Sequence, residues 1–286
     1  MDLSIIIVSW QVKKKLKKNI ESIYLSKTKY SFEIFVVDNA SNDGTVSMLK
    51  ENFPKVNIIA NSKNIGFSSA CNQAILKAKG DFILLLNPDM KLYPDTLEKA
   101  VLWHKSNNEI VVSGIKLENE KGENILQIRR FPKLFDQLAI IFKIPHFLPG
   151  VLNKYLYKDF DYNKSQAVDS IRGSFFLINK LAWQKISKQK LPLLDSKYFL
   201  WFEEVDFCKQ VYTKKALVYY NSEAKACDLV GQSFTQVNFF KKQSYFSQSM
   251  LIFFKKWKPY WQYLIIKIAW SIVFIIIKLK KKIWKK

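Results

Sequence analysis

The sequence predicts an α/β protein with a mostly parallel sheet flanked by helices, followed by a membrane-associated helical tail. Short apolar, β-branched runs recur at Leu3–Ser9, Phe32–Val37, Val56–Ala60, Phe82–Leu86 and Ile110–Ser113. Apolar residues at helical spacing occupy residues 12–24 and 70–78 between these runs. Strands that alternate with helices usually form a parallel sheet, and runs such as FILLL are typical of strands covered on both faces. We therefore expect helices on both sides of one sheet.

The composition is typical of a folded protein in a reducing compartment. Of the 286 residues, 49% are hydrophobic and 15% are aromatic, which is enough to bury a sizeable core. Cys71, Cys208 and Cys227 are odd in number and widely spaced, so they indicate neither a disulfide framework nor a zinc site. No basic stretch precedes the first apolar run, and a cleaved signal peptide is not expected.

Positive charge is concentrated toward the C-terminal end. From residue 229 onward the chain has 12 Lys and no acidic residue, and the net charge of the whole chain is +22. The same region is rich in Trp, Tyr, Phe and Ile, which favours an anionic membrane surface as the partner and no nucleic acid. Tyr260–Ile277 is at the short limit for a transmembrane helix and contains Lys267. We therefore favour a helix lying in the membrane interface, with a single span as the alternative.

Polar clusters follow three of the predicted strands. They are Val8-Ser9-Trp10, Asp38-Asn39 with the turn that continues to Thr45, and Asn87-Pro88-Asp89. Ligands of parallel sheets bind beyond the carboxyl ends of the strands, so the three clusters are expected at one edge of the sheet. Carboxylates there can accept hydrogen bonds from a ribose or a pyrimidine, and a helix N-terminus attracts phosphate. Each cluster alone is also explained as an ordinary turn, because Asn, Asp, Ser and Gly favour turns.

The second half of the chain contains two further candidate segments. Residues 168–178 are predicted to form a strand with Gly173 inside it, and a glycine in a strand suggests close approach of a ligand. Glu203, Glu204 and Asp206 follow an aromatic run, and a carboxylate whose pKa is raised by a like-charged neighbour suits a general base. The alternative is the acidic first turn of a helix, which the helix dipole favours without any catalytic role. The apolar stretch 135–152 is expected to pack in the core, with a surface that meets a lipid acceptor as the alternative.

A series of motifs runs along the chain in the order SIIIVSW, FEIFVVDNASNDGT, NSKNIGFSSACNQAI, GDFILLLNPDM, RGSFFLI and FLWFEEVDFC. Over about residues 2–235 these motifs resemble glycosyltransferase family 2, and most of all the rhamnosyltransferase-like branch that builds bacterial polysaccharides. The resemblance implies a Rossmann-like GT-A fold, Mg²⁺ or Mn²⁺ as cofactor, and inversion at the anomeric carbon of the sugar. We expect a GT-A domain (1–235) with a nucleotide-binding half (1–115) and an acceptor half (116–235), followed by a basic aromatic tail (236–286).

The resemblance assigns roles to residues of this chain. The positions that would hold the nucleotide sugar are Val8, Ser9, Trp10, Asp38, Asn39, Asn64, Gly66, Phe67, Asn72, Asn87, Arg172 and Gly173. Asn87 and Asp89 stand in place of the family's Asp-x-Asp motif, so Asp89 is the expected direct ligand of the metal. Glu204 stands at the position of the general base, where the family has Asp, and Glu203 and Asp206 are the alternatives.

The sequence thus predicts an inverting, metal-dependent glycosyltransferase at the cytoplasmic face of the cell membrane, held there peripherally or by a single anchor. Its donor is a nucleoside-diphosphate sugar, with rhamnose suggested by the resemblance, and its acceptor a glycan or a polyprenyl-diphosphate-linked sugar of cell-surface polysaccharide. One alternative is a non-catalytic membrane-binding relative, since Asn87, Glu204 and Asp228, which stands where the family often has His, depart from the family pattern. Another is a sugar nucleotidyltransferase, against which the absence of a glycine-rich loop after the first strand counts.

Overall fold

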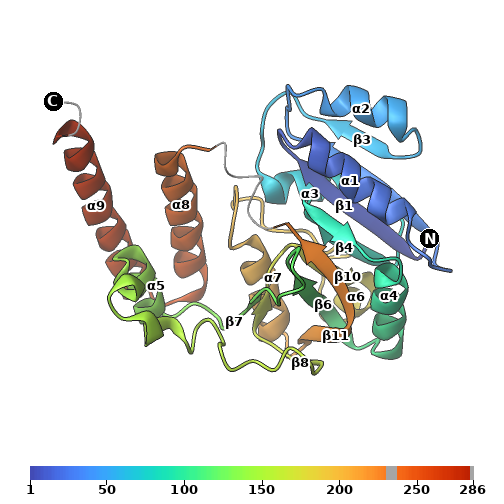
Figure 1. The fold of residues 1–286 in the computed structure, drawn as a ribbon. Coiled ribbons are helices and arrows are strands. Elements are labelled where there is room, and N and C mark those ends of the chain that lie inside the picture. The colour runs from blue at the N-terminus through green and yellow to red at the C-terminus, as the bar shows by residue number, and fades with distance from the viewer. Residues whose placement is uncertain (230–236, 284–286) are drawn as a thin grey trace.

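The computed structural model describes residues 1–229 and 237–283, and a nine-stranded sheet lies at its centre. The strands of this sheet are β1 (Leu3–Ser9), β2 (Phe32–Asp38), β3 (Asn57–Ala60), β4 (Phe82–Leu86), β5 (Met90–Leu92), β6 (Ile110–Glu118), β8 (Gln166–Ala167), β10 (Phe175–Asn179) and β11 (Leu217–Asp228). Their order is β3-β2-β1-β4-β10-β6-β11-β5, with β8 paired to β11 (Figure 1). Two further strands, β7 (Ile128–Arg129) and β9 (Ser170–Ile171), pair only with each other.

Most strands of the sheet run in the same direction. β1 is parallel to β2 and β4, β3 is parallel to β2, and β6 is parallel to β11. β10 is antiparallel to both β4 and β6, so β6 and β11 run the same way as β4. The prediction of a mostly parallel sheet flanked by helices is therefore confirmed. The carboxyl ends of β1, β2 and β4 lie along one edge, where the polar clusters were expected.

The prediction of a single strand over residues 168–178 is wrong in one respect. The chain forms β9 and then β10, and Gly173 lies between the two strands instead of inside one. Ser174, beside it, accepts a hydrogen bond at its carbonyl oxygen from the backbone N–H of Asn87 (3.0 Å), outside the regular ladder. This connection holds residues 172–174 against the end of β4.

Two hydrophobic clusters cover the two faces of the sheet, because successive strand residues point to opposite sides. Ile5 and Ile7 belong to one cluster, whereas Ile6 and Val8 belong to the other. The first face is covered by α1 (Lys13–Tyr24), α2 (Thr45–Asn52) and α4 (Thr96–Ser106), and the second by α3 (Phe67–Ile75), α6 (Lys180–Ile186) and α7 (Glu203–Thr213). The three cysteines are free and buried.

A lobe of helices stands beside the sheet, and we call it the C-terminal helical lobe. It consists of α5 (Leu134–Ile141), α8 (Phe239–Trp257) and α9 (Tyr260–Ile283), with the short 3-10 turns η1 (Ile144–His146) and η2 (Pro149–Leu152) near α5 (Figure 1). Its own hydrophobic cluster includes Trp270 and Phe253, and it also takes in Tyr198 and Phe202 from the segment before α7. The lobe therefore packs directly against the sheet domain.

The prediction that residues 135–152 pack in the core is correct only in part. Ile141 on α5 is buried in the cluster of the helical lobe, and Leu152 in η2 is buried as well. Phe135 and Phe147, however, are 82% and 83% exposed, and Leu148 is exposed as well. The reason is that α5 buries only one of its faces in the lobe, which leaves Phe135 exposed.

Candidate active site

A cleft of about 260 Å³ opens at the edge of the sheet formed by the carboxyl ends of β1, β2 and β4. Its walls come from segments that are far apart in the sequence. The lining residues are Val8, Trp10, Asn39, Asn64, Gly66, Phe67, Asn87, Pro88, Asp89, Arg172, Gly173, Ser174, Phe199, Leu200, Trp201, Glu203 and Glu204. Most residues predicted for the site thus lie around one cavity.

Four of the predicted site residues do not line this cleft. Ser9 and Asp38 are buried behind its wall at the ends of β1 and β2. Asn72 instead holds the backbone of Leu194, with Nδ2 donating to the carbonyl oxygen at 2.8 Å and Oδ1 accepting from the N–H at 2.9 Å. Asp206 lies in a separate polar network, described below. These residues support the walls, and the structure brings none of them to the cavity surface.

The first wall of the cleft is built by Asn39, Asn64 and Gly66. Asn39 donates from Nδ2 to the carbonyl oxygen of Gly66 (3.2 Å), and its own backbone N–H donates to Ser9 (2.8 Å). Asn64 Oδ1 accepts from the Gly66 N–H (3.0 Å). Behind this wall, Ser9 Oγ and Asp38 Oδ1 are buried and find no hydrogen-bond partner among the described residues. Buried polar atoms are normally paired, so this wall has unused hydrogen-bonding capacity for a polar ligand or for water.

Gly66 is required by its geometry. Its backbone φ is +86°, a value that residues with a side chain rarely adopt. An added Cβ would also lie 2.6 Å from the carbonyl oxygen of Phe199. The next residue, Phe67, donates its N–H to the same oxygen at 2.7 Å. The glycine therefore lets the start of α3 approach the segment that carries the opposite wall.

Asp89 and Asn87 form the part of the cleft suited to a metal. Asn87 donates from Nδ2 to Ser174 Oγ (3.3 Å), and the turn is held from below by Asn19, which donates to the carbonyl oxygen of Met90 (2.7 Å). In the described residues, no group of three or more His, Cys, Asp and Glu side chains is arranged to hold a metal ion. A single carboxylate with an amide beside it still fits Mg²⁺ or Mn²⁺, because such ions commonly take one or two protein carboxylates together with substrate phosphates.

Asp228 reaches the same region from the end of β11. It is buried and lies 3.6 Å from the guanidinium of Arg172 in an ion pair. β11 pairs with β5 so that Asp228 is opposite Met90, and the following Leu229 donates its N–H to the carbonyl oxygen of Asp89 (3.2 Å). Asp228, which departs from the family pattern, is therefore a direct neighbour of the candidate metal ligand and of Arg172, the only cationic residue that the described part of the chain contributes to the lining.

The opposite wall is acidic. Glu203 and Glu204 begin α7, and one carboxylate oxygen of each is buried without a hydrogen-bond partner among the described residues. Burial raises the pKa of both carboxyl groups, and for Glu203 the neighbouring Glu204 raises the pKa further. Arg172 lowers the pKa of Glu204 and so opposes the effect of burial there. The pKa is consequently raised less for Glu204 than for Glu203, and Glu204 is the more easily ionised of the pair.

The backbone before these acids is strained. Trp201 and Phe202 have φ values of +65° and +68°, which cost non-glycine residues about 1–3 kcal/mol each. Such conformations persist only where surrounding contacts hold them, and they are enriched at functional sites. The two residues turn the chain so that α7 starts with its acidic end at the cleft.

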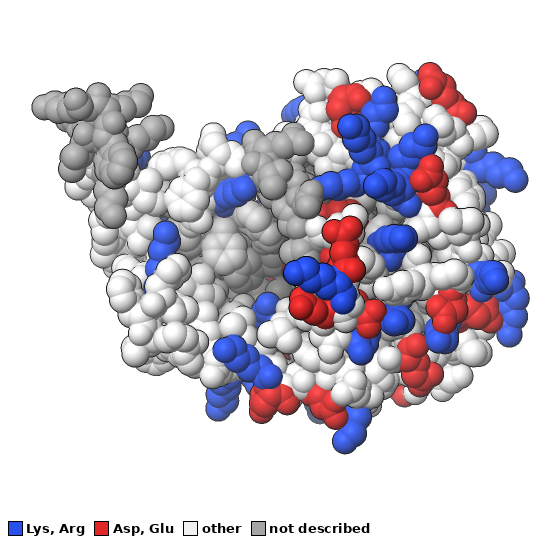
Figure 2. All heavy atoms as spheres, in the orientation of Figure 1, with Lys and Arg blue, Asp and Glu red and all other residues white. Residues whose placement is uncertain are grey.

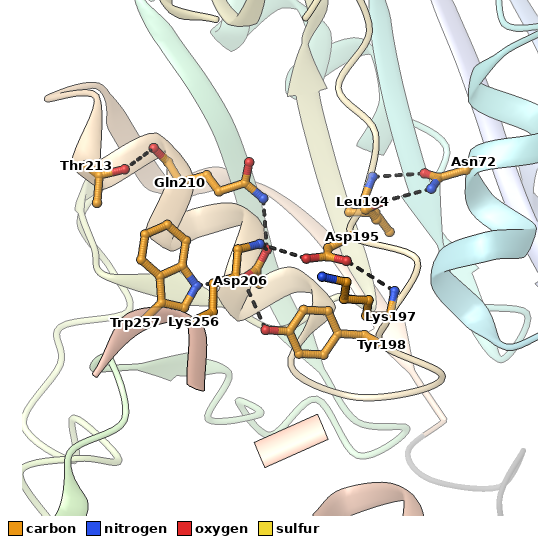
Figure 3. A network of polar contacts seen from close by, with 10 residues as sticks. All are labelled: Asn72, Leu194, Asp195, Lys197, Tyr198, Asp206, Gln210, Thr213, Lys256 and Trp257. Carbon is orange, nitrogen blue, oxygen red and sulfur yellow. Dashed lines mark hydrogen bonds and ion pairs between the residues drawn. The ribbon is translucent and has the colours of Figure 1, made fainter. Parts of the chain in front are cut away.

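The expectation that Asp206 is an alternative catalytic base does not fit its surroundings. Its carboxylate is fully buried and accepts hydrogen bonds from Tyr198 Oη (3.1 Å), Gln210 Nε2 (2.8 Å), Lys256 Nζ (2.8 Å) and Trp257 Nε1 (2.6 Å) (Figure 3). With both oxygens engaged and no contact with the cleft, it has no free position for the proton of a substrate. Asp206 therefore acts as a structural partner of α8.

Sequence reasoning did not assign Pro88, Ser174, Phe199, Leu200 and Trp201 to the site, although all five line it. Pro88 and Ser174 directly adjoin residues that were assigned, whereas Phe199, Leu200 and Trp201 precede the assigned Glu203 by only a few positions. The signal was therefore present as proximity in the chain, and what the motifs lacked was the direction of each side chain. Asn19, which supports the turn at Asn87, carries no signal in the sequence beyond being a buried polar residue on an apolar helix face.

Comparison with known proteins identifies relatives of this chain. The model of glycosyl transferase family 2 matches residues 4–182. An uncharacterised glycosyltransferase, YfnE of Bacillus subtilis, is 31% identical over 40% of this chain, although the match spans only 30% of its own length. The N-acetylglucosaminyl-diphospho-decaprenol L-rhamnosyltransferase of Mycobacterium tuberculosis is 21% identical over 71% of this chain and 68% of its own.

Solved structures show the same fold. A mannosyltransferase from Pyrobaculum calidifontis in complex with GDP-Man and Mn²⁺ aligns with 89% of this chain and 63% of its own at a TM-score of 0.57 and 15% identity. The Staphylococcus aureus protein TarS (residues 1–349) in complex with UDP-GlcNAc aligns with 88% of this chain and 67% of its own at a TM-score of 0.52 and 17% identity. At these identities the likeness establishes the GT-A fold alone. Glu203, Glu204 and Asp228 lie beyond the residues that the family model matches.

Proposed function

Because this chain belongs to glycosyl transferase family 2 and is a glycosyltransferase, we propose that it transfers a sugar, with inversion, from a nucleoside-diphosphate sugar to a glycan or polyprenyl-diphosphate-linked acceptor. The observation that carries the proposal is the cleft in which Asp89 lines one wall and Glu203 and Glu204 the other. A metal-assisted leaving group and a general base are the two groups that a single-displacement transfer requires.

The proposed reaction uses these walls in one step. The acceptor hydroxyl attacks the anomeric carbon from the side of Glu204, its proton passes to the Glu204 carboxylate, and the nucleoside diphosphate leaves on the side of Asp89. A Mg²⁺ or Mn²⁺ ion held by Asp89 would neutralise the negative charge that develops on the departing diphosphate. Attack and departure on opposite faces of the sugar give inversion.

Glu204 suits the role of base better than Glu203. A general base must be ionised before it accepts a proton. Burial raises the pKa of both groups, but only Glu204 has a guanidinium, that of Arg172, to favour its charged form. Glu203, whose pKa is raised further by Glu204, is suited to remain protonated beside it.

The C-terminal helical lobe supports association with an anionic membrane. The helix α9 contains a 20-residue stretch, Tyr260–Leu279, with a mean hydropathy of 1.9, which is long and apolar enough to cross a membrane by length and composition alone. Its inner face, with Ile266 and Trp270, packs in the lobe, whereas Trp261, Ile268 and Ile275 are exposed along its outer face.

In Figure 2 the region of α8 and α9 is white with scattered blue, and no Asp or Glu occurs beyond residue 228. An apolar stripe with surrounding lysines matches an anionic membrane interface. We therefore propose peripheral binding to the cytoplasmic face, with α9 lying in the interface. The test is sedimentation with vesicles that contain about 30% phosphatidylserine, an anionic lipid that attracts basic segments. Binding that Ile268→Ser/Ile275→Ser abolishes supports the stripe, and equal sedimentation of this variant with wild type contradicts it.

The proposed activity is tested first by calorimetric titration with dTDP, UDP and GDP, with and without Mn²⁺. Transfer is then measured from dTDP-L-rhamnose, UDP-N-acetylglucosamine and GDP-mannose to N-acetylglucosaminyl-diphospho-polyprenol, and the product anomer is identified by NMR. Rhamnose is the first donor to test, because the mycobacterial relative is an L-rhamnosyltransferase by name. Inverted product formed only with metal supports the proposal. Retained configuration would overturn the mechanism, and binding of no nucleotide would favour a non-catalytic relative.

A further inference from the structure

The C-terminal helical lobe also contacts the catalytic wall, and we infer that Lys256 and Trp257 at the end of α8 are positioning residues for Glu204. They act through Asp206, which holds the first turn of α7. The inference rests on the proposed function, because the expected loss of activity requires that Glu204 is the general base. It means that the tail is a required part of the active site and does more than attach the protein to a membrane.

Asp206 is the centre of the contact between α7 and α8. Lys256 Nζ lies 2.8 Å from Asp206 Oδ2 and 2.8 Å from Asp195 Oδ2, so one ammonium group bridges the first turn of α7 and the loop before it (Figure 3). Trp257 Nε1 donates to the other oxygen of Asp206 at 2.6 Å. Both donors come from the last turn of α8, about fifty residues away in the chain. A carboxylate that is fully buried depends on such partners for its charge to be tolerated.

A second set of contacts holds the aromatic run that lines the cleft. Ser249 Oγ on α8 donates to the carbonyl oxygen of Leu200 (2.7 Å). The ring of Phe199 stacks on Tyr245 with centroids 4.4 Å apart, and Phe202 packs on Phe253 at 5.6 Å. Thus α8 contacts both the segment before α7 and the first turn of α7.

The strained backbone explains why these contacts matter for the position of Glu204. Trp201 and Phe202 adopt left-handed conformations, and without contacts that hold them their backbone would relax to negative φ values. Relaxation of either residue would rotate the start of α7 and move Glu203 and Glu204 relative to Asp89. On α7, Asp206 lies just two residues after Glu204, so a contact at Asp206 constrains the same helical turn.

The test compares variants of the 286-residue chain that alter this contact by one group at a time. Lys256→Met removes the cation but keeps most of the side-chain volume, and Lys256→Arg restores a charged donor. Trp257→Phe removes only the indole N–H and part of the ring. Lys255→Met is the matched control, since Lys255 is an exposed lysine next to Lys256 on the same helix and makes no hydrogen bond to Asp195 or Asp206 among the described residues. Each variant is assayed for kcat, donor KM, dTDP and UDP affinity, and melting temperature.

We expect Lys256→Met to lower kcat roughly 10- to 100-fold, the range for a small displacement of a catalytic group. Donor KM and nucleotide affinity should stay within about 3-fold, because the donor wall on α3 and β4 is not touched. Lys256→Arg should recover most of kcat, and Lys255→Met should behave as wild type. In the Asp206→Asn background the loss caused by Lys256→Met should shrink, since no buried charge then needs a partner.

A kcat of Lys256→Met equal to that of Lys255→Met, in a wild-type protein that does transfer sugar, would overturn the inference while leaving the proposed function intact. Hydrogen exchange gives a readout that does not depend on activity. Amides of residues 199–206 should exchange faster in Lys256→Met than in Lys255→Met at the same temperature, and unchanged exchange would also overturn the inference. Absence of transfer by the wild-type protein would instead count against the proposed function.

Discussion

Replacing Glu204 by Gln removes the proposed base while it preserves the shape of the side chain. The structure places this carboxylate in the cleft with one oxygen buried and without a partner among the described residues. The amide of a Gln at this position can accept a hydrogen bond from the acceptor hydroxyl but is too weak a base to take its proton. General bases typically contribute 10²- to 10⁴-fold to the rate, which corresponds to about 3–5 kcal/mol in the barrier.

The structure favours the middle of that range, about 10³-fold. Glu203 is buried and Glu204 is half-buried, so bulk water has limited access to replace the lost base. Glu203→Gln is the matched control on the neighbouring position, and it should lower kcat less than about 10-fold, since we expect Glu203 to be protonated already. Nucleotide affinity should be unchanged in both variants, because neither side chain is on the donor wall.

The assay is kcat at saturating donor, measured from pH 5 to 9. The wild-type rate should fall as the pH drops through the pKa of Glu204, which burial raises and Arg172 partly lowers, with Glu203 as its acidic neighbour on the same helix. The residual rate of Glu204→Gln should lack that acidic limb. A variant with more than a tenth of the wild-type kcat, or a larger loss in Glu203→Gln than in Glu204→Gln, would refute the assignment of the base.

Three further predictions follow from the same geometry. Glu203→Gln should raise the melting temperature, and more at pH 8 than at pH 5. Above the ordinary pKa of Glu the unfolded chain has lost the proton that folded Glu203 keeps, so the stability of the wild type falls as the pH rises toward the raised pKa of Glu203. A gain in melting temperature that does not depend on pH would contradict this. Gly66→Ala should lower the free energy of unfolding, measured with urea, by about 1–3 kcal/mol because of backbone strain. The clash with Phe199 should add a further loss. Gly122→Ala, with a φ of +78° and open space around it, is its control, and equal losses would rule out the clash. Asp89→Ala should weaken Mn²⁺-dependent nucleotide binding by at least about 100-fold in calorimetry, with the exposed Asp95→Ala as a control that should bind like wild type.

The sequence predicts the sheet and the donor wall well for a physical reason. Apolar, β-branched strands and the polar residues that end them are local signals, and parallel strands bring those ends to one edge whatever the loops do. The strand Leu3–Ser9 was predicted with the bounds that the structure has, and Val8, Asn39 and Asn87 line the cleft as expected. For these residues, position along the strand decides position in the site.

The acidic wall was harder to predict because its geometry is not local. Glu203, Glu204 and Asp206 are close in sequence and alike in chemistry, yet two face the cleft and the third faces α8. Which acid faces which side depends on the left-handed turn at Trp201 and Phe202 and on a helix fifty residues later. Neither feature has a pattern that a single sequence displays.

The charge of the cleft supports a metal even though the first carboxylate of the family motif is replaced by Asn87. The charged residues of the lining are Asp89, Glu203, Glu204 and Arg172, and Arg172 is already paired with Asp228. A diphosphate would therefore enter an acidic, poorly solvated site, where like charges repel strongly, unless a cation accompanies it. A divalent ion held by Asp89 would supply that charge with a single protein carboxylate, and Asn87 in place of a second acid would reduce the repulsion that the diphosphate meets.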